Sequence, residues 1–207
     1  MKTLLKSVGA AAVLAVAGAA HAVPVTLTGV TLLSPASQVF GTLNGTPYGD
    51  GAGALRVDTV ERGSFIAFCT ELDAVLSPTY PVTYDYTTYT QDGVARVLSL
   101  YGTGAYSAAA TQVAIWEAVY DSVAGDLSAG VFTLNAPAGL LAESTALLAA
   151  AGALTVGQYD PNSMRALNNA RYQDLVTVVP EPSTYALLLA GLTGIGFVAR
   201  RRSQDRA

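Results

Sequence analysis

The chain has 207 residues and a formal net charge of −4. Between residues 23 and 179, five arginines stand against thirteen acidic residues, a net charge of −8 that argues against nucleic acid as a partner. The only histidine is His21 and the only lysines are Lys2 and Lys6, so residues 23–179 contain neither type. This excludes Ser-His-Asp and Cys-His catalysis, lysine Schiff bases and most zinc sites from that segment.

The N-terminus has the pattern of a cleaved secretory signal peptide. Two lysines precede an apolar run at Val8–Ala20, and Ala20-His21-Ala22 forms an A-x-A cleavage site. We predict cleavage after Ala22, which assigns residues 1–22 to the signal peptide. The alternative is a retained membrane anchor, for which the apolar run is short against the roughly 20 residues that a span needs.

Residues 23–179 are predicted to form one extracytoplasmic α+β domain. Alternation, β-branched residues and turn residues predict its strands. In chain order the expected elements are strand Val23–Leu33, loop 44–53, a hairpin of Ala54–Val60 and Ser64–Cys69, strand or loop Tyr80–Tyr89, helix Gly93–Gly102, a helix capped by Ser107 that ends near Asp121, helix Pro137–Ala151 and strand Arg171–Val179. The expected fold therefore has strands at both ends, a central helical insert and a C-terminal transmembrane helix.

The C-terminal segment predicts a membrane helix with a basic end. Residues 183–199 are uncharged and almost wholly apolar, and three arginines follow at once. This length is near the lower limit for a span, and the arginines favour a cytoplasmic end. Tyr185 lies near the outer boundary, where aromatic rings favour the interface.

The elements at this end, taken in order, resemble the PEP-CTERM sorting signal. The matching positions are Pro180, Glu181 and Pro182, then the helix at 183–199, then Arg200, Arg201 and Arg202. We assign residues 180–203 to this signal. The resemblance implies an exosortase-type transpeptidase as a partner. It also implies an exported protein held in the inner membrane by this helix and then released to the cell surface or an exopolysaccharide matrix. A plain C-terminal anchor is the alternative.

The only cysteine, Cys69, is best interpreted together with Gln112 on the second predicted helix. Ile115, Trp116 and Val119 lie three, four and seven residues after Gln112, so the four share one helix face. A glutamine that points into the core with the only tryptophan would cost roughly 1–3 kcal/mol without partners. Hydrogen bonds or a covalent bond could compensate, and a lone cysteine often simply packs in a core.

The sequences "FCTE" at 68–71 and "TQVAIW" at 111–116 resemble the two signature motifs of thioester domains in bacterial surface adhesins. The resemblance implies an internal thioester between Cys69 and Gln112, with Phe68, Glu71, Thr111 and Trp116 as supporting motif residues. Two features depart from that family, whose best-known members come from Gram-positive bacteria: the cysteine–glutamine spacing is compact, and the tail implies a Gram-negative cell. Glu71 or Asp73 could transfer the proton when the bond forms, and the sequence does not select between them.

The leading hypothesis is a covalent adhesin that captures an amine on another surface. It predicts no catalytic residue, no cofactor, no metal site and no enzyme activity. The alternative is a non-covalent matrix protein that binds polysaccharide through Tyr84, Tyr86 and Tyr89, whose amphipathic rings suit an exposed strip. A hydrolase with paired carboxylates is a third possibility, although the spacing of the acids singles out no pair.

Overall fold

The computed structural model describes residues 22–123 and 125–178. The body of the predicted signal peptide, residues 1–21, lies outside the described residues. So do the sorting-signal positions 180–203, including the membrane helix expected at 183–199. Within the described part of the chain, no helix has both the length and the apolar character needed to cross a membrane.

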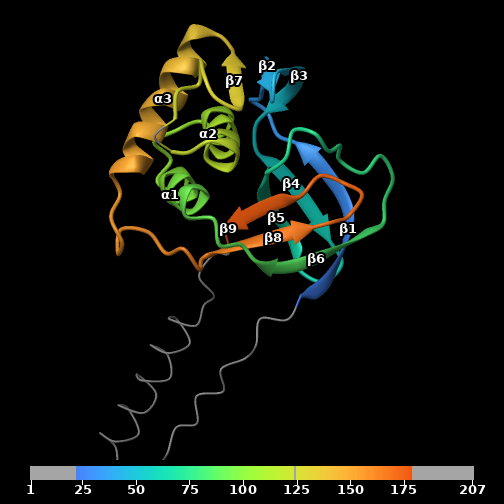
Figure 1. Cartoon of the computed structure of the whole chain (residues 1–207). Coiled ribbons are helices and arrows are strands. Elements are labelled where there is room, and N and C mark those ends of the chain that lie inside the picture. Colours follow the sequence, from blue (N-terminus) through green and yellow to red (C-terminus); the bar gives the residue numbers. More distant parts are fainter. Residues whose placement is uncertain (1–21, 124, 179–207) are drawn as a thin grey trace, which may run out of the picture.

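Six antiparallel strands close into a barrel in the order β1-β4-β5-β9-β8-β6 (Figure 1). The strands are β1 (Val23–Leu32), β4 (Leu55–Thr59), β5 (Gly63–Cys69), β6 (Val82–Thr88), β8 (Met164–Asn168) and β9 (Leu175–Val178). Alternate residues point into the barrel, as Val25 and Leu27 of β1 and Leu55 and Val57 of β4 show by their burial. All pairing partners of these strands lie within residues 23–178, so this segment contains a complete barrel.

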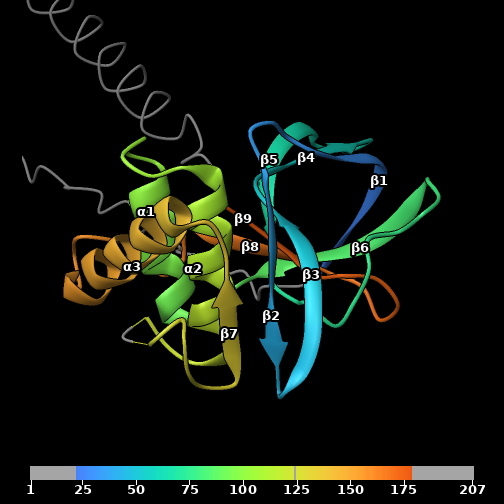
Figure 2. The same cartoon turned by 90° about the horizontal axis from the view of Figure 1, so that it is seen from above.

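A separate three-stranded sheet, in the order β3-β2-β7, stands beside the barrel (Figure 2). It consists of β2 (Ser37–Leu43), β3 (Thr46–Ala52) and β7 (Phe132–Asn135). Asn44 and Gly45, with φ of 51° and 77°, form the tight turn between β2 and β3, and two positive values are what a two-residue type I′ hairpin requires. The prediction of a loop at 44–53 is therefore wrong, because its Asn-Gly pair is the turn of a hairpin and most of the remainder is strand β3.

Three helices pack on one another next to this sheet: α1 (Asp92–Tyr101), α2 (Ala108–Tyr120) and α3 (Ala138–Ala153) (Figure 1). Helix α2 is the central one, and ten of its thirteen residues are buried. The Ser107 hydroxyl accepts a hydrogen bond from the Ala110 N–H at 3.1 Å, which confirms the predicted N-cap. Glu143 of α3 accepts from both the N–H and the hydroxyl of Ser107, at 2.7 and 2.8 Å, and so links the two helices.

The described domain mixes helices and strands, as predicted, but its strands are arranged differently. The three expected helices are present within a residue or two of their predicted ends. Strand β7 separates α2 from α3, so the helices do not form one uninterrupted insert. Strands β2, β7 and β8 had no counterpart in the prediction, and the final strand is only the last part of the expected Arg171–Val179.

Candidate functional site: the Cys69–Gln112 pair

Cys69 and Gln112 meet where the end of β5 reaches the middle of α2. The Cys69 N–H donates to Gln112 Oε1 at 2.9 Å, and Gln112 Nε2 donates to the Cys69 carbonyl oxygen at 2.8 Å. Both residues are buried, with exposed fractions of 7% and 1%. The two residues are separated by 43 positions in the chain, and the fold brings the side-chain amide of one directly onto the backbone of the other.

This contact explains how a glutamine is tolerated in the core. The β4–β5 pairing ends at Leu55–Ala67, two residues before Cys69. The Gln112 amide hydrogen-bonds to both the N–H and the C=O of Cys69. It thus takes the place that a backbone residue of β4 would occupy if the strand pairing continued to Cys69. The amide is therefore satisfied without water, as a buried polar group requires. The expectation that Gln112 points into the core beside Trp116 is confirmed, since both are buried.

The surroundings of Cys69 hold its thiol in the protonated form. The pKa of the thiol is raised well above its ordinary value, mainly by burial and then by the negative charges of Asp50 and Glu71. Asp50 lies on β3, which contacts α2, and sequence reasoning did not single it out. No local signal could have done so, because the β2–β3 hairpin brings this residue to the site from a distant part of the chain.

Glu71, one of the two acids proposed for proton transfer, is partly engaged by the backbone. Its Oε2 accepts a hydrogen bond from the Asp174 N–H at 3.0 Å. The pKa of the Glu71 carboxyl is raised, mainly by burial; the Asp174 N–H opposes this rise, and the charges of Asp174 and Asp73 add to it. A carboxyl that retains its proton more readily than usual is better suited to act as a proton donor than an ordinary surface carboxylate. The charges that raise the pKa of the Cys69 thiol belong to Asp50 and Glu71. Asp73 makes no such contribution.

The other motif residues support the site from different sides. Phe68 packs edge-to-face on Tyr101 of α1, with ring centroids 4.9 Å apart. Trp116 is fully buried, and its ring centroid is 6.4 Å from that of Phe132. The Thr111 hydroxyl donates to the Ser107 carbonyl at 2.9 Å, so it serves the first turn of α2.

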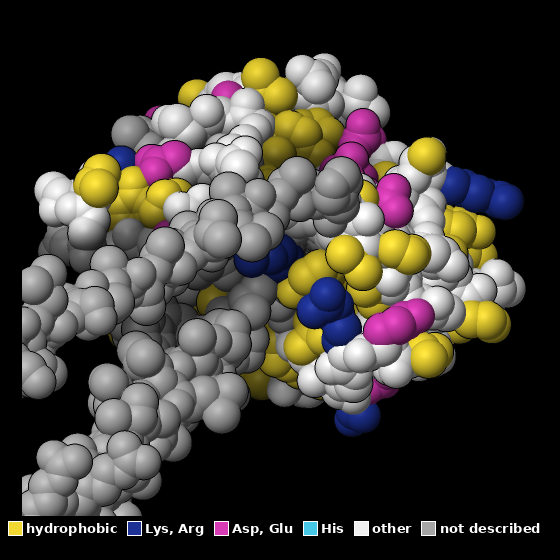
Figure 3. Space-filling model, turned by 90° about the horizontal axis from the view of Figure 1, so that it is seen from below, with side chains coloured by type: hydrophobic (Ala, Val, Ile, Leu, Met, Phe, Trp, Pro, Cys, Tyr) yellow, Lys and Arg dark blue, Asp and Glu magenta, His cyan; other side chains and the backbone are white. Residues whose placement is uncertain are grey.

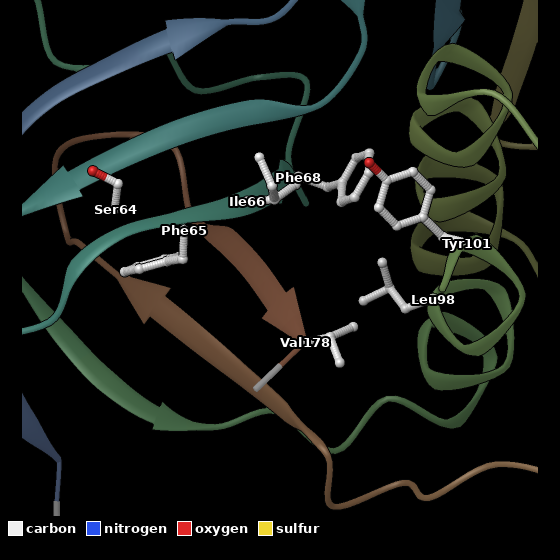
Figure 4. Close-up of a pocket in the computed structure, with 7 residues that line it drawn as sticks. All are labelled: Ser64, Phe65, Ile66, Phe68, Leu98, Tyr101 and Val178. Carbon is white, nitrogen blue, oxygen red and sulfur yellow. The ribbon is translucent and has the colours of Figure 1, made fainter. Parts of the chain in front are cut away.

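A hydrophobic cavity of about 320 Å³ lies between the barrel and α1 (Figure 4). Phe68, Leu98 and Tyr101 converge on it, and Val178 at the end of β9 closes one side. Phe68 directly precedes Cys69 on β5, and successive strand residues point to opposite faces. The cavity is therefore on the Phe68 side of the strand.

A buried acid lies on α2 at Glu117. Its side chain is fully buried, and neither carboxyl oxygen has a hydrogen-bond partner within the described residues. Gly125 covers it so closely that a Cβ at that position would lie 1.6 Å from Oε1. Burial raises the pKa of Glu117 to about 7, with further contributions from the charges of Asp121 and Asp126.

The three tyrosines proposed as a sugar-binding strip do not share one exposed surface. Tyr84 is buried inside the barrel, and its hydroxyl donates to the Gln173 carbonyl at 3.3 Å. The guanidinium of Arg62 lies 3.9 Å from the centre of the Tyr86 ring, which it covers. Tyr89 lies just beyond the end of β6, is partly buried, and donates its hydroxyl to Gln91 Oε1 at 2.9 Å. The expectation of an exposed strip is wrong, because β6 is a barrel strand and its alternate residues, Tyr84 among them, point inward.

The described acids form no cluster of the kind that binds a metal ion. Residues 22–123 and 125–178 contain no group of three His, Cys, Asp or Glu side chains placed to hold a metal ion. On the face shown in Figure 3, acidic and basic side chains are interspersed among apolar ones.

Comparison with known proteins identifies the C-terminal segment. Residues 178–202 match the PEP-CTERM protein-sorting motif. The chain is thus an exported protein with a sorting signal, and the signal is the kind recognised by an exosortase, which implies membrane-associated sorting. The match includes the predicted Pro-Glu-Pro triplet and the arginines up to Arg202. Comparison with curated proteins and with solved structures finds no match.

Proposed function

We propose that residues 23–179 form a covalent adhesin in which Cys69 and Gln112 react with each other to give an internal thioester. The observation that carries this proposal is the pair of hydrogen bonds between the Gln112 amide and the Cys69 backbone, at 2.9 and 2.8 Å. Since Sγ is separated from its own backbone nitrogen by only three bonds, these contacts bring nucleophile and amide carbon into the same small, buried space. Holding two groups in fixed proximity removes a large part of the barrier to a reaction between them.

The formation step balances with the two side chains alone. Cys69 Sγ attacks Gln112 Cδ, the S–C bond forms and the C–N bond to Nε2 breaks. The amide nitrogen leaves as ammonia and takes the thiol proton with it. The Cys69 N–H already donates to Gln112 Oε1, where negative charge develops in the tetrahedral intermediate, so it provides one preformed oxyanion contact.

The capture step uses an amine on another surface. The amine attacks Gln112 Cδ, a new C–N bond forms and the C–S bond breaks. The Cys69 thiolate then takes the proton that the nitrogen gives up, and the target remains attached through an amide. Each chain reacts once and is not regenerated, so in this proposal the protein is not an enzyme.

Burial supports a long-lived thioester. Trp116 is fully buried and Gln112 is 1% exposed, so little water reaches the bond. The surroundings also raise the pKa of the Cys69 thiol, and a thiol of high pKa is a poor leaving group. Both effects slow hydrolysis before a target arrives.

The sorting motif supplies the location for such a protein. In this proposal a membrane helix at 183–199 holds the exported domain at the inner membrane until exosortase acts. The protein then reaches the cell surface or the extracellular matrix, where its target carries amines. We expect no nucleic-acid partner, because the net charge of residues 23–179 is −8.

The intact mass of purified residues 23–179, with and without methylamine, tests the proposal. We expect a mass one ammonia lighter than the sequence requires, and methylamine should then add to Gln112. Cys69→Ala is the control, and it should show the full sequence mass and no methylamine adduct. An unmodified mass with Cys69 freely alkylated after unfolding would falsify the thioester.

That second result would favour the alternative, a non-covalent matrix protein. The same Cys69→Ala variant separates the two hypotheses in a binding assay. Covalent capture gives an attachment to target cells that resists boiling in detergent. If Cys69→Ala loses this attachment, the capture is covalent. Unchanged attachment indicates that Cys69 is simply a core residue.

A further inference from the structure

The outward face of the three-stranded sheet carries a set of side chains that the thioester proposal does not use. The register places Phe40 on the central strand β2 between Gly49 of β3 and Asn135 of β7. In the adjacent row Thr42 lies between Pro47 and Thr133. Paired residues point to the same side of a sheet, so these side chains form one surface. The opposite face is buried and belongs to the core, as Val39, Phe132 and Leu134 show.

Phe40 forms an open aromatic platform on this face. Its side chain is 55% exposed although it occupies the middle strand of the sheet. A Cβ at Gly49 would lie 2.9 Å from Cδ1 and 3.0 Å from Cε1 of Phe40, so the ring occupies the space above that glycine. One side of the ring therefore rests on β3, and the other remains available to a ligand.

Uncharged polar groups surround the ring. Within the described residues, no hydrogen bond engages the side-chain amides of Gln38 and Asn135, and both side chains are exposed. Gln38 Nε2 approaches the same glycine as the ring, 3.9 Å from the Cβ position of Gly49. The Thr42 and Thr133 hydroxyls lie 2.8 Å apart in the neighbouring row. None of these outward positions carries a charge.

The platform borders a groove large enough for more than one ring. The groove has a volume of about 540 Å³ and runs along Phe40, Thr42, Thr133 and Asn135. Sites for small ligands typically combine an apolar surface with a few polar groups that fix orientation, at volumes of roughly 300–1,000 Å³. An exposed aromatic ring beside free amides suits a ligand with both an apolar face and hydroxyl groups.

We propose that this face binds a neutral polysaccharide. The C–H face of a pyranose ring stacks on Phe40, and its equatorial hydroxyls hydrogen-bond to the amides of Gln38 and Asn135. A neutral ligand fits because the face has no cation to pair with a uronate or phosphate group. This inference is independent of the thioester, since the platform lies on the opposite face of the sheet from the core.

Affinity gel electrophoresis of residues 23–179 tests this site. The gels contain galactomannan, hydroxyethylcellulose or dextran as neutral probes and alginate as an anionic one. The Cys69→Ala background removes covalent capture from the measurement. We expect at least one neutral polysaccharide to retard the protein, and Phe40→Ala to weaken that retardation by about fivefold or more.

Two further variants separate ring stacking from general stickiness. Phe40→Tyr keeps the aromatic face and should retain binding, whereas Phe40→Leu keeps an apolar side chain and should lose it. Val60→Ala, at a position that is 67% exposed on the barrel, is the matched control and should behave as the parent. Retardation by none of the neutral probes, retardation by alginate alone, or equal binding by Phe40→Leu and the parent would each overturn the proposal.

Discussion

Replacing Gln112 by leucine should reveal how much the amide bridge stabilises the fold. The comparison is made in the Cys69→Ala background, where no thioester can form. The two hydrogen bonds to residue 69 persist there, because both use its backbone. Leucine has a similar volume but cannot pair with that backbone N–H and C=O.

The expected loss follows from two orphaned groups in a buried place. An unpaired buried donor or acceptor costs about 1–3 kcal/mol, so two cost about 2–6 kcal/mol. Burial of the leucine side chain offsets about 1.5–3 kcal/mol of this. The net loss in the free energy of unfolding is on the order of 2 kcal/mol, or roughly 4–8 °C in Tm for a domain of this size.

Urea unfolding followed by tryptophan fluorescence measures this loss, because Trp116 lies in the same core. The midpoint should fall while the m-value stays the same. Gln38→Leu is the control, since Gln38 is exposed and should change stability by no more than about 0.5 kcal/mol. If Gln112→Leu costs as little as this control, the amide bridge does not stabilise the fold and the site argument fails.

Three further outcomes can be measured. Asp50→Asn removes a charge that raises the pKa of the Cys69 thiol, so in the Gln112→Leu variant the rate of iodoacetamide alkylation at Cys69 should rise at a fixed, mildly alkaline pH, and an unchanged rate contradicts the assignment. Glu117 has a folded-state pKa of about 7, above its unfolded value, so stability should decline by on the order of 2 kcal/mol as pH rises from about 4.5 to above 7. Glu117→Gln should flatten that decline in urea titrations, and a parallel curve argues against the carboxyl as its cause. Gly45→Ala should lower the free energy of unfolding by about 1–2 kcal/mol, because φ is +77° there while no atom lies near the added Cβ, and no loss would count against a type I′ turn.

The helices could be predicted because their signals are local. Apolar spacing and the Ser107 cap are properties of a few adjacent residues, and the structure confirms them. The β2–β3 hairpin was missed because β3 contains Pro47, Gly49 and Gly51, a composition that resembles a loop. The informative signal was the Asn44-Gly45 pair between two segments of equal length. The overall topology could not be predicted, because barrel closure depends on pairings such as β5 with β9 that join distant parts of the chain.

The candidate site was only partly predictable. The motif resemblance named Cys69 and Gln112, and the structure places them in hydrogen-bonding contact. The thioester itself stays a prediction. Asp50 could not be found from sequence because its approach depends on the hairpin fold. Tyr84 was predicted to be exposed and is buried. A tyrosine-rich strand has the same sequence pattern whether its alternate residues face a barrel interior or solvent.

The last strand of the barrel has a mechanical consequence for an attached protein. Strand β9 ends at Val178, which is also the first residue of the matched sorting motif, so the last described strand of the barrel leads directly into that motif. A target held at Gln112 and an anchor beyond Val178 would pull only on the chain between these two residues. Strands β1 to β6 lie outside that path and would resist only through their contacts with it. Tension would therefore be borne first where β9 pairs with β5, at Phe68–Val176 and Cys69–Leu175.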